Sequence, residues 1–333
     1  MLGETMGLRA TFLMTYFIAQ FGFRICKETL IDSYCISSLS IFNFVVTLLS
    51  WIILSLLKKS SRLSTSPPVP FHAKIITAFL QSLHFIFLTK SISVNTFSVH
   101  RFALLLAIPF GLFISYFFLK RKISSSSMVS ISIFLVGACM ISTDSFSISS
   151  FGLSVGLLYA LFNSVLSVYI ENVIIESGSS SINLQESVAG FRLLFLALFA
   201  FFDLISQPKY SISFQLDFYP LCLILVASAL DLALTVSMIS LISATSSISF
   251  LVAEQFCELF MILIGHTLNP THFTTIQEAV SSFLGFALAL PGQALFVVVG
   301  DTTDSRPTDI EPFRPLSPAD SSNPPADTDN LIE

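Results

Sequence analysis

Residues 73–119 read AKIITAFLQSLHFIFLTKSISVNTFSVHRFALLLAIPFGLFISYFFL, the most informative stretch of this chain. A transmembrane helix needs about 20 mostly apolar residues. The stretch contains two such segments, 73–92 and 95–119, with only Ser93 and Val94 between them. Because so short a connection forces consecutive helices to run antiparallel, the stretch predicts part of a compact helical bundle in a membrane.

The composition of the whole chain agrees with this interpretation. Its 333 residues are 53% hydrophobic and 11% charged, with a mean hydropathy of +0.82. Soluble domains carry about 25% charged residues, so most of this surface does not face water. We therefore predict an all-α integral membrane protein with ten transmembrane helices, at 7–26, 35–57, 73–92, 95–119, 127–144, 151–171, 187–206, 218–241, 244–266 and 274–299.

Lysine and arginine predict the orientation, because they concentrate in cytoplasmic connections. Two connections are basic, the one between the second and third spans and the one between the fourth and fifth. The residues are Lys58, Lys59, Arg62 and Lys74 in the first, and Lys120, Arg121 and Lys122 in the second. The opposite side offers mainly Lys27, Lys90 and Lys209. With ten spans, both basic connections lie on the side of both termini, which we expect in the cytosol.

Residues 300–333 have a different composition. They hold six of the 14 prolines, two arginines and eight acids, namely Asp301, Asp304, Asp309, Glu311, Asp320, Asp327, Asp329 and Glu333. Such a segment buries too little apolar surface to order itself, so we expect a disordered cytosolic tail. Near its end, Asp327 precedes Leu331 and Ile332 as in an acidic dileucine sorting signal, which predicts binding to a coat adaptor.

Several classes of function find no support. No basic stripe suggests nucleic acid as a partner. The five cysteines, without a CxxC pair, indicate no disulfide framework and no zinc site. The chain has no HExxH, GxSxG or phosphate-binding glycine loop, so we predict neither an enzyme nor a cofactor or metal site. The expected partners are the lipid bilayer and a small solute.

Small residues recur at every fourth position of the sixth span, at Gly152, Gly156, Ala160 and Ser164. In lipid, such a row lets two helix backbones approach closely. The favoured interpretation is tight packing inside one chain, and the alternative is a homodimer interface.

Charged residues inside apolar segments are costly and mark candidate sites. Arg101 lies early in the fourth span and Arg192 in the seventh, and two guanidinium groups could clamp an anionic solute. The alternatives for Arg101 are a structural ion pair or a side chain that reaches the membrane surface. Weaker polar candidates are Asn163, Asn172, His84 and Gln20.

The ninth span carries Glu254, Gln255 and Glu258, and the two acids share one helix face because they are four residues apart. This arrangement suits proton coupling or a cationic solute, and it equally suits ion pairs with Arg101 or Arg192. Asp231, near the middle of the eighth span, is the deepest acid by position and must be protonated or paired.

Residues 97–169 resemble the middle of the nucleotide-sugar and triose-phosphate translocators of the drug/metabolite transporter superfamily. An arginine-bearing fourth span precedes the short basic loop LKRKIS. The fifth span ends in Val136-Gly137-Ala138 followed by Asp144, and Phe-Gly at 151–152 opens the sixth. Residues 243–265, SATSSISFLVAEQFCELFMILIG, are similar to the ninth span of that family.

This resemblance implies two inverted five-helix halves, 1–145 and 151–299, around a central site, and an antiporter in Golgi or related membranes. The chain departs from the family at three places. Glu254 and Gln255 stand where a phosphate-contacting lysine is common, Gly190-Phe191-Arg192 where a Tyr-Asn pair is common, and His100-Arg101 where paired arginines are common.

We therefore expect a carrier for a small polar, anionic solute such as a nucleotide sugar or sugar phosphate. Arg101, Arg192, Glu254, Gln255, Glu258 and Asp231 are the predicted solute-binding residues. Two alternatives stay open at this point: a non-transporting membrane scaffold or trafficking protein of the same fold, and a carrier of a cationic or neutral metabolite. An endosomal or lysosomal address is the alternative to the Golgi.

Overall fold

The computed structural model describes residues 2–34, 39–60, 67–95, 97–120, 123–142, 149–206, 218–268 and 276–303. All regular structure in these ranges is α-helical. The helices are α1 (Leu2–Tyr34), α2 (Leu39–Ser60), α3 (Phe71–Val94), α4 (Phe97–Leu105), α5 (Ala107–Phe118), α6 (Ser125–Ser142), α7 (Ser150–Ser177), α8 (Ser181–Ser206), α9 (Phe218–Ala244), α10 (Ser247–Leu268) and α11 (Ile276–Thr303).

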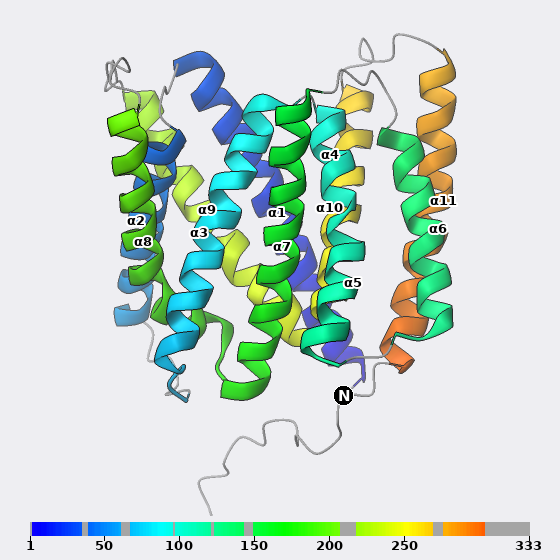
Figure 1. The fold of residues 1–333 in the computed structure, drawn as a ribbon, viewed down its shortest axis with the longest axis horizontal. Helices are drawn as coiled ribbons and strands as arrows, with labels where there is room; N and C mark the ends of the chain where they lie inside the picture. Colours follow the sequence, from blue (N-terminus) through cyan, green and yellow to red (C-terminus); the bar gives the residue numbers. More distant parts are fainter. Residues whose placement is uncertain are drawn as a thin grey trace, which may run out of the picture.

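The helices run roughly parallel to one axis and alternate in direction, with α4 and α5 together making one crossing (Figure 1). The N-terminus, the end of α2, the start of α3 and the end of α11 lie at the same, lower end of this view. Each predicted span overlaps one described helix, except 95–119, which overlaps α4 and α5, and 244–266, which overlaps α10 and the last residue of α9. The predicted tail from residue 304 onward, with its sorting signal, lies outside the described residues.

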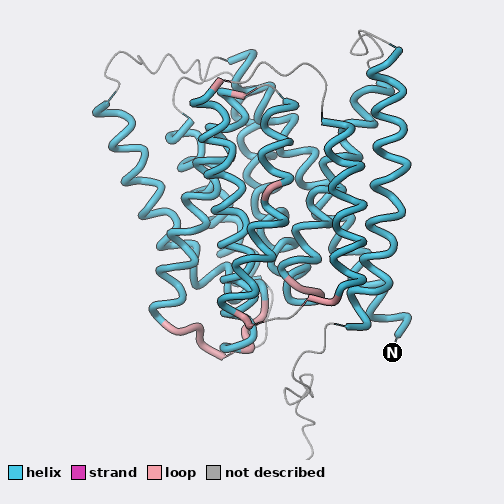
Figure 2. The backbone as a smooth tube through the Cα atoms, turned by 45° about the vertical axis from the view of Figure 1, so that its right-hand side comes forward, coloured by secondary structure: helices cyan, strands magenta, loops and turns pink. Residues whose placement is uncertain are grey.

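The break between α4 and α5 corrects the prediction of one continuous fourth span. Pro109 has no backbone N–H, so it cannot bond the carbonyl of Leu105, and its ring disfavours a regular turn before it. The chain responds with a tighter turn, in which the Leu106 N–H donates to the Ala103 carbonyl at 3.1 Å. Figure 2 shows this break as a short non-helical segment inside the bundle.

Two boundaries also differ from the prediction. Helix α1 continues to Tyr34, so Lys27 is a buried residue of this helix (1% exposed) and not part of a connection at the membrane surface. Lys27 therefore gives no information on orientation. At the other end, α11 reaches Thr303, so residues 300–303 belong to a helix and not to the tail.

The row of small residues in α7 packs inside the chain. A Cβ atom at Gly156 would lie 2.7 Å from the Cβ of Ala103, and one at Gly152 would lie 2.1 Å from the side chain of Asn95. Two turns beyond Gly156, the Ser164 hydroxyl lies 2.7 Å from the Ala107 carbonyl. The row thus brings α7 against α3, α4 and α5, in agreement with the favoured interpretation.

Helices α6 and α11 pack backbone to backbone. A Cβ atom at Gly137 would lie 2.5 Å from the carbonyl oxygen of Gly285, and one at Gly292 would lie 2.5 Å from the amide nitrogen of Phe134. Only glycine permits this approach. The two helices stand side by side in both views (Figures 1 and 2).

The distribution of polar and apolar side chains is inverted relative to a water-soluble protein. Large apolar side chains cover the outside, among them Phe113, Phe117, Phe118, Phe202 and Phe218, whereas charged side chains are buried inside. An exterior of this kind is stable in lipid and not in water. Six described stretches are long and apolar enough to cross a membrane: Ser40–Lys59, Phe71–Val94, Val99–Phe118, Ser150–Ser177, Ser181–Ile205 and Phe218–Ala244.

Candidate functional site

The interior of the bundle holds three groups of polar side chains. The first is the Glu254 group, formed by Tyr16 of α1, Asn163 of α7 and Glu254 of α10. The Tyr16 hydroxyl donates to Glu254 Oε1 at 3.1 Å, and the Asn163 amide donates to Glu254 Oε2 at 2.6 Å. All three side chains are buried. Both carboxylate oxygens are thus held by neutral donors.

The second is the Glu258 group, formed by Gln20 and Arg24 of α1, Arg101 of α4 and Glu258 of α10. Gln20 donates to Glu258 Oε1 at 2.7 Å. Arg24 and Arg101 both lie on Glu258 Oε2, at 3.3 and 3.5 Å. Arg101 is only 3% exposed, so it does not reach the membrane surface. Its partner is the predicted acid Glu258, and Arg24 joins the same carboxylate.

Two histidines and a tyrosine connect these groups to the rest of the interior. The ring of Tyr159 stacks on His100, with 5.4 Å between ring centroids, and lies 5.3 Å from the ring of His84. The Ser91 hydroxyl and His100 Nδ1 are hydrogen-bonded at 2.8 Å. His100 also lies within electrostatic range of Arg24, Lys27 and Arg101.

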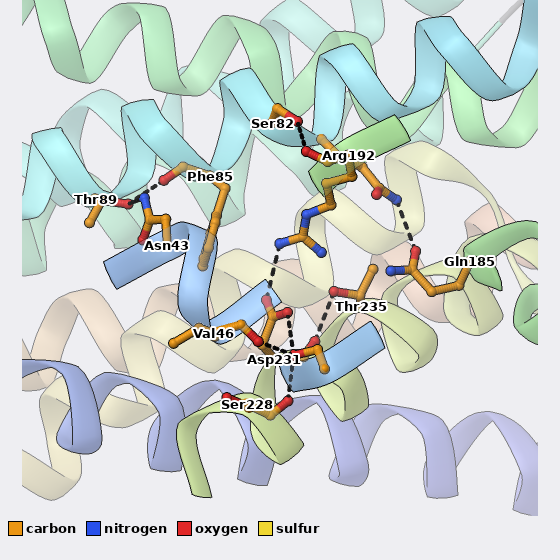
Figure 3. Close-up of polar contacts among 12 residues, drawn as sticks. Asn43, Val46, Ser82, Phe85, Thr89, Gln185, Arg192, Ser228, Asp231 and Thr235 are labelled. Carbon is orange, nitrogen blue, oxygen red and sulfur yellow. Dashed lines mark hydrogen bonds and ion pairs between the residues drawn. The ribbon is translucent and has the colours of Figure 1, made fainter. Parts of the chain in front are cut away.

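The third is the Arg192 group, formed by Ser50 of α2, Phe85 of α3, Arg192 of α8 and Asp231 of α9 (Figure 3). Arg192 donates to Asp231 Oδ1 at 3.2 Å, and its guanidinium lies 5.0 Å from the centroid of the Phe85 ring. Ser50 donates to Asp231 Oδ2 at 3.0 Å. The deep acid Asp231 is therefore paired.

The predicted solute-binding residues thus fall into separate places. Arg101 and Glu258 meet, and Glu254 lies one helical turn from Glu258 on α10. Arg192 instead pairs with Asp231. The Gln255 amide donates to the Leu104 carbonyl at 3.2 Å, a carbonyl next to the α4–α5 break. Asn172 bonds Glu176 on an exposed part of α7 and does not join the interior groups.

The sequence-based prediction missed several interior residues. Tyr16, Gln20 and Arg24 recur at every fourth position of α1, a spacing that places them on one helix face. This spacing is a signal in the sequence that these three side chains lie together, but the sequence-based prediction included only Gln20.

Glu171 of α7 was also missed. Its carboxylate accepts from the Ser247 N–H at 2.9 Å and from the Ser247 hydroxyl at 2.6 Å. Ser247 is the first residue of α10, where backbone N–H groups have no partner within the helix. The Glu171 carboxylate accepts from this N–H group, and its negative charge is favourable at the positive end of the helix dipole. Its role is therefore structural. Among the described residues, no cluster of three or more histidines, cysteines or acids could hold a metal ion.

An apolar exterior over a charged interior defines the class of this chain, a multi-pass α-helical membrane protein. The chain is similar to the Arabidopsis thaliana protein "Nucleotide-sugar uncharacterized transporter 2". The two are 22% identical over 270 residues, which cover 76% of this chain and 67% of the relative.

A protein of known crystal structure shares the fold, with a TM-score of 0.62 over 87% of this chain and 99% of its own. At 13% identity, this likeness speaks for the fold alone. No protein-family model matches the chain.

Proposed function

We propose that this protein is an antiporter-type carrier for a small anionic solute, such as a nucleotide sugar or a sugar phosphate, in a Golgi-type endomembrane. The observation that carries the proposal is the buried Glu258 group. Its charges come from three helices and meet in the interior of a bundle whose exterior is apolar. Intramembrane charges of this kind mark solute pathways. The similarity to a plant nucleotide-sugar transporter supports the same class.

The cations near His100 support an anionic solute. Arg24, Lys27 and Arg101 all lie within electrostatic range of this ring, and Arg24 and Arg101 share one carboxylate, that of Glu258. A phosphate or carboxylate group could displace Glu258 from Arg24 and Arg101, whose planar guanidinium groups suit such ligands.

The pattern of helix packing supports two inverted five-helix halves, with α1–α6 forming five crossings and α7–α11 the other five. In this arrangement, α1 corresponds to α7, α2 to α8 and α3 to α9. The contact of α1 with α9 then corresponds to the contact of α7 with α3. The contact of α2 with α9 becomes the contact of α8 with α3. All four contacts are present. Carriers with inverted repeats expose a midplane site to each side in turn by rocking one half against the other.

The test is counterflow in proteoliposomes with the purified protein. The panel contains nucleotide sugars, phosphorylated sugars, free nucleotides and several organic cations. Saturable uptake of one anionic class supports the proposal. Uptake of cations alone would move the site to Glu254 and Glu258 and reject an anionic solute. No uptake by folded protein would reject the carrier and favour a membrane scaffold.

A further inference from the structure

We propose that Glu254 binds a proton that crosses the membrane together with the anionic solute, while Glu258 pairs with the buried arginines. This inference rests on the proposed function, because it assigns the coupling ion of the same carrier. The two carboxylates lie one turn apart on α10 but have different partners. Arg24 and Arg101 lie on Glu258. Among the described residues, Glu254 receives hydrogen bonds from Tyr16 and Asn163 alone.

None of the described residues that contact Glu254 is a cation. Tyr16 faces it from α1 and Tyr159 from α7, and its own helix contributes Cys257 and Glu258. On α4, Arg101 lies on Glu258 and His100 stacks on Tyr159. Among the described residues of α5, α6, α9 and α11, no titratable side chain contacts Glu254. A buried carboxylate without a cationic partner has a large desolvation cost, which proton uptake removes.

Asn163 can satisfy both protonation states of Glu254. In the structure, Asn163 Nδ2 donates to Oε2 at 2.6 Å, an arrangement that suits the ionised carboxylate. Asn163 Oδ1 is buried and has no hydrogen-bond partner among the described residues. A half-turn of the amide would present this oxygen as an acceptor to a carboxylic O–H group. Tyr16 can donate to Oε1 in either state.

The proton and the anion assist each other electrostatically. On uptake, an O–H bond forms at Glu254 Oε2 with a proton from water on one side of the membrane. On release, this bond breaks and the proton passes to water on the other side. Protonated Glu254 no longer repels an anion that binds Arg24 and Arg101 one turn away. Because coupling is reciprocal, a bound anion in turn favours proton uptake, so the two move in the same direction.

The experiment uses the full-length protein in proteoliposomes, with UDP-glucose and glucose 6-phosphate as probes. For each variant, uptake is measured with and without an inward proton gradient, and the ratio is the readout. In the wild type we expect the gradient to raise uptake by about fivefold or more. In Glu254→Gln we expect a ratio of one. The matched control is Glu186→Gln, which changes a half-buried acid paired with Lys58 outside the interior groups and should keep the wild-type ratio.

A second readout needs no solute. Infrared spectra of the purified protein in nanodiscs report the carboxylic C=O band as the sample is acidified. We expect one component of this band to appear before the exposed carboxylates are protonated at about pH 4. It should be present in the wild type and in Glu186→Gln and missing from Glu254→Gln. A component of equal size in Glu254→Gln would overturn the inference, as would its absence from the wild type.

The outcomes separate the two proposals. Wild-type counterflow that does not respond to the gradient would overturn the role of Glu254 and leave the carrier intact. Absence of counterflow with both probes would contradict the proposed function for these solute classes. In that case the infrared band alone decides whether Glu254 binds a proton.

Discussion

Arg192 and Asp231 form an ion pair of 3.2 Å between α8 and α9, and their side chains are only 4% and 3% exposed. Ser50 of α2 bonds the same carboxylate, and Phe85 of α3 lies against the guanidinium (Figure 3). Four helices, two from each half of the chain, therefore meet at one pair of charges. Because both side chains are buried, each charge needs the other as its counter-charge.

Replacement of Arg192 by alanine should destabilise the protein strongly, since Asp231 would remain buried without a counter-charge. We expect a loss of about 3–5 kcal/mol of unfolding free energy. Denaturant unfolding in detergent, without solute, measures it. The control is Glu186→Ala, which breaks the exposed pair with Lys58 and should cost at most about 1 kcal/mol. Equal losses in the two variants would refute the importance of the buried pair.

Addition of one methyl group at Gly292 should disturb the contact of α6 with α11. The new Cβ atom would lie 2.5 Å from the backbone nitrogen of Phe134, which cannot move alone. Gly292→Ala should cost about 1–3 kcal/mol, measured by thermal unfolding in detergent. Gly190→Ala is the matched control, because its Cβ atom would meet nothing within 4 Å. That change should be neutral or stabilise helix α8 by up to about 1 kcal/mol. If both variants unfold alike, the close packing is not needed.

Loss of the Glu171 carboxylate should weaken the start of α10. Glu171→Ala removes the bonds to the N–H and hydroxyl of Ser247 and should cost about 0.5–2 kcal/mol. Hydrogen exchange should then speed up in the first turn of α10. Glu176→Ala changes an exposed acid on the same helix α7, and its effect should stay within about 0.5 kcal/mol. Unchanged exchange in Glu171→Ala would argue against the cap.

Solute exchange should depend on Arg101. Arg101→Ala removes a charged hydrogen-bond donor worth about 1.5–3 kcal/mol, which corresponds to roughly a 10–150-fold loss of transport efficiency. Counterflow of the solute class selected by the panel measures the loss. Lys58→Ala, at an exposed lysine, should retain wild-type exchange. Retained exchange in Arg101→Ala would remove this arginine from the mechanism.

The C-terminal segment should affect the cellular address and not the transport rate. All three interior groups lie before residue 304, so a chain that ends at residue 303 should keep wild-type counterflow. The double change Leu331→Ala and Ile332→Ala should redistribute the tagged protein among endomembranes, as seen by microscopy. Lost counterflow in the shortened chain would contradict the first expectation. An unchanged distribution of the double variant would contradict the second.

The sequence predicted most of the helices because hydropathy is a local property of each segment. It also contained the cause of the α4–α5 break, since Pro109 was visible within the fourth span. It singled out Arg101, Arg192, Glu254, Glu258 and Asp231 because a charge in an apolar segment is costly wherever it lies. For Tyr16 it offered only the four-residue spacing from Gln20 and Arg24, because a tyrosine in such a segment is common.

The sequence alone determined that this is an all-helical membrane protein and that its buried charges are costly, because both properties depend on short stretches of residues. The pairing of those charges did not follow. Arg101 could have met Glu254 or Glu258, and Arg192 could have met either acid or Asp231. The choice depends on how each helix is rotated and how closely its neighbours approach. Those quantities arise from packing between segments up to 238 residues apart, such as Tyr16 and Glu254.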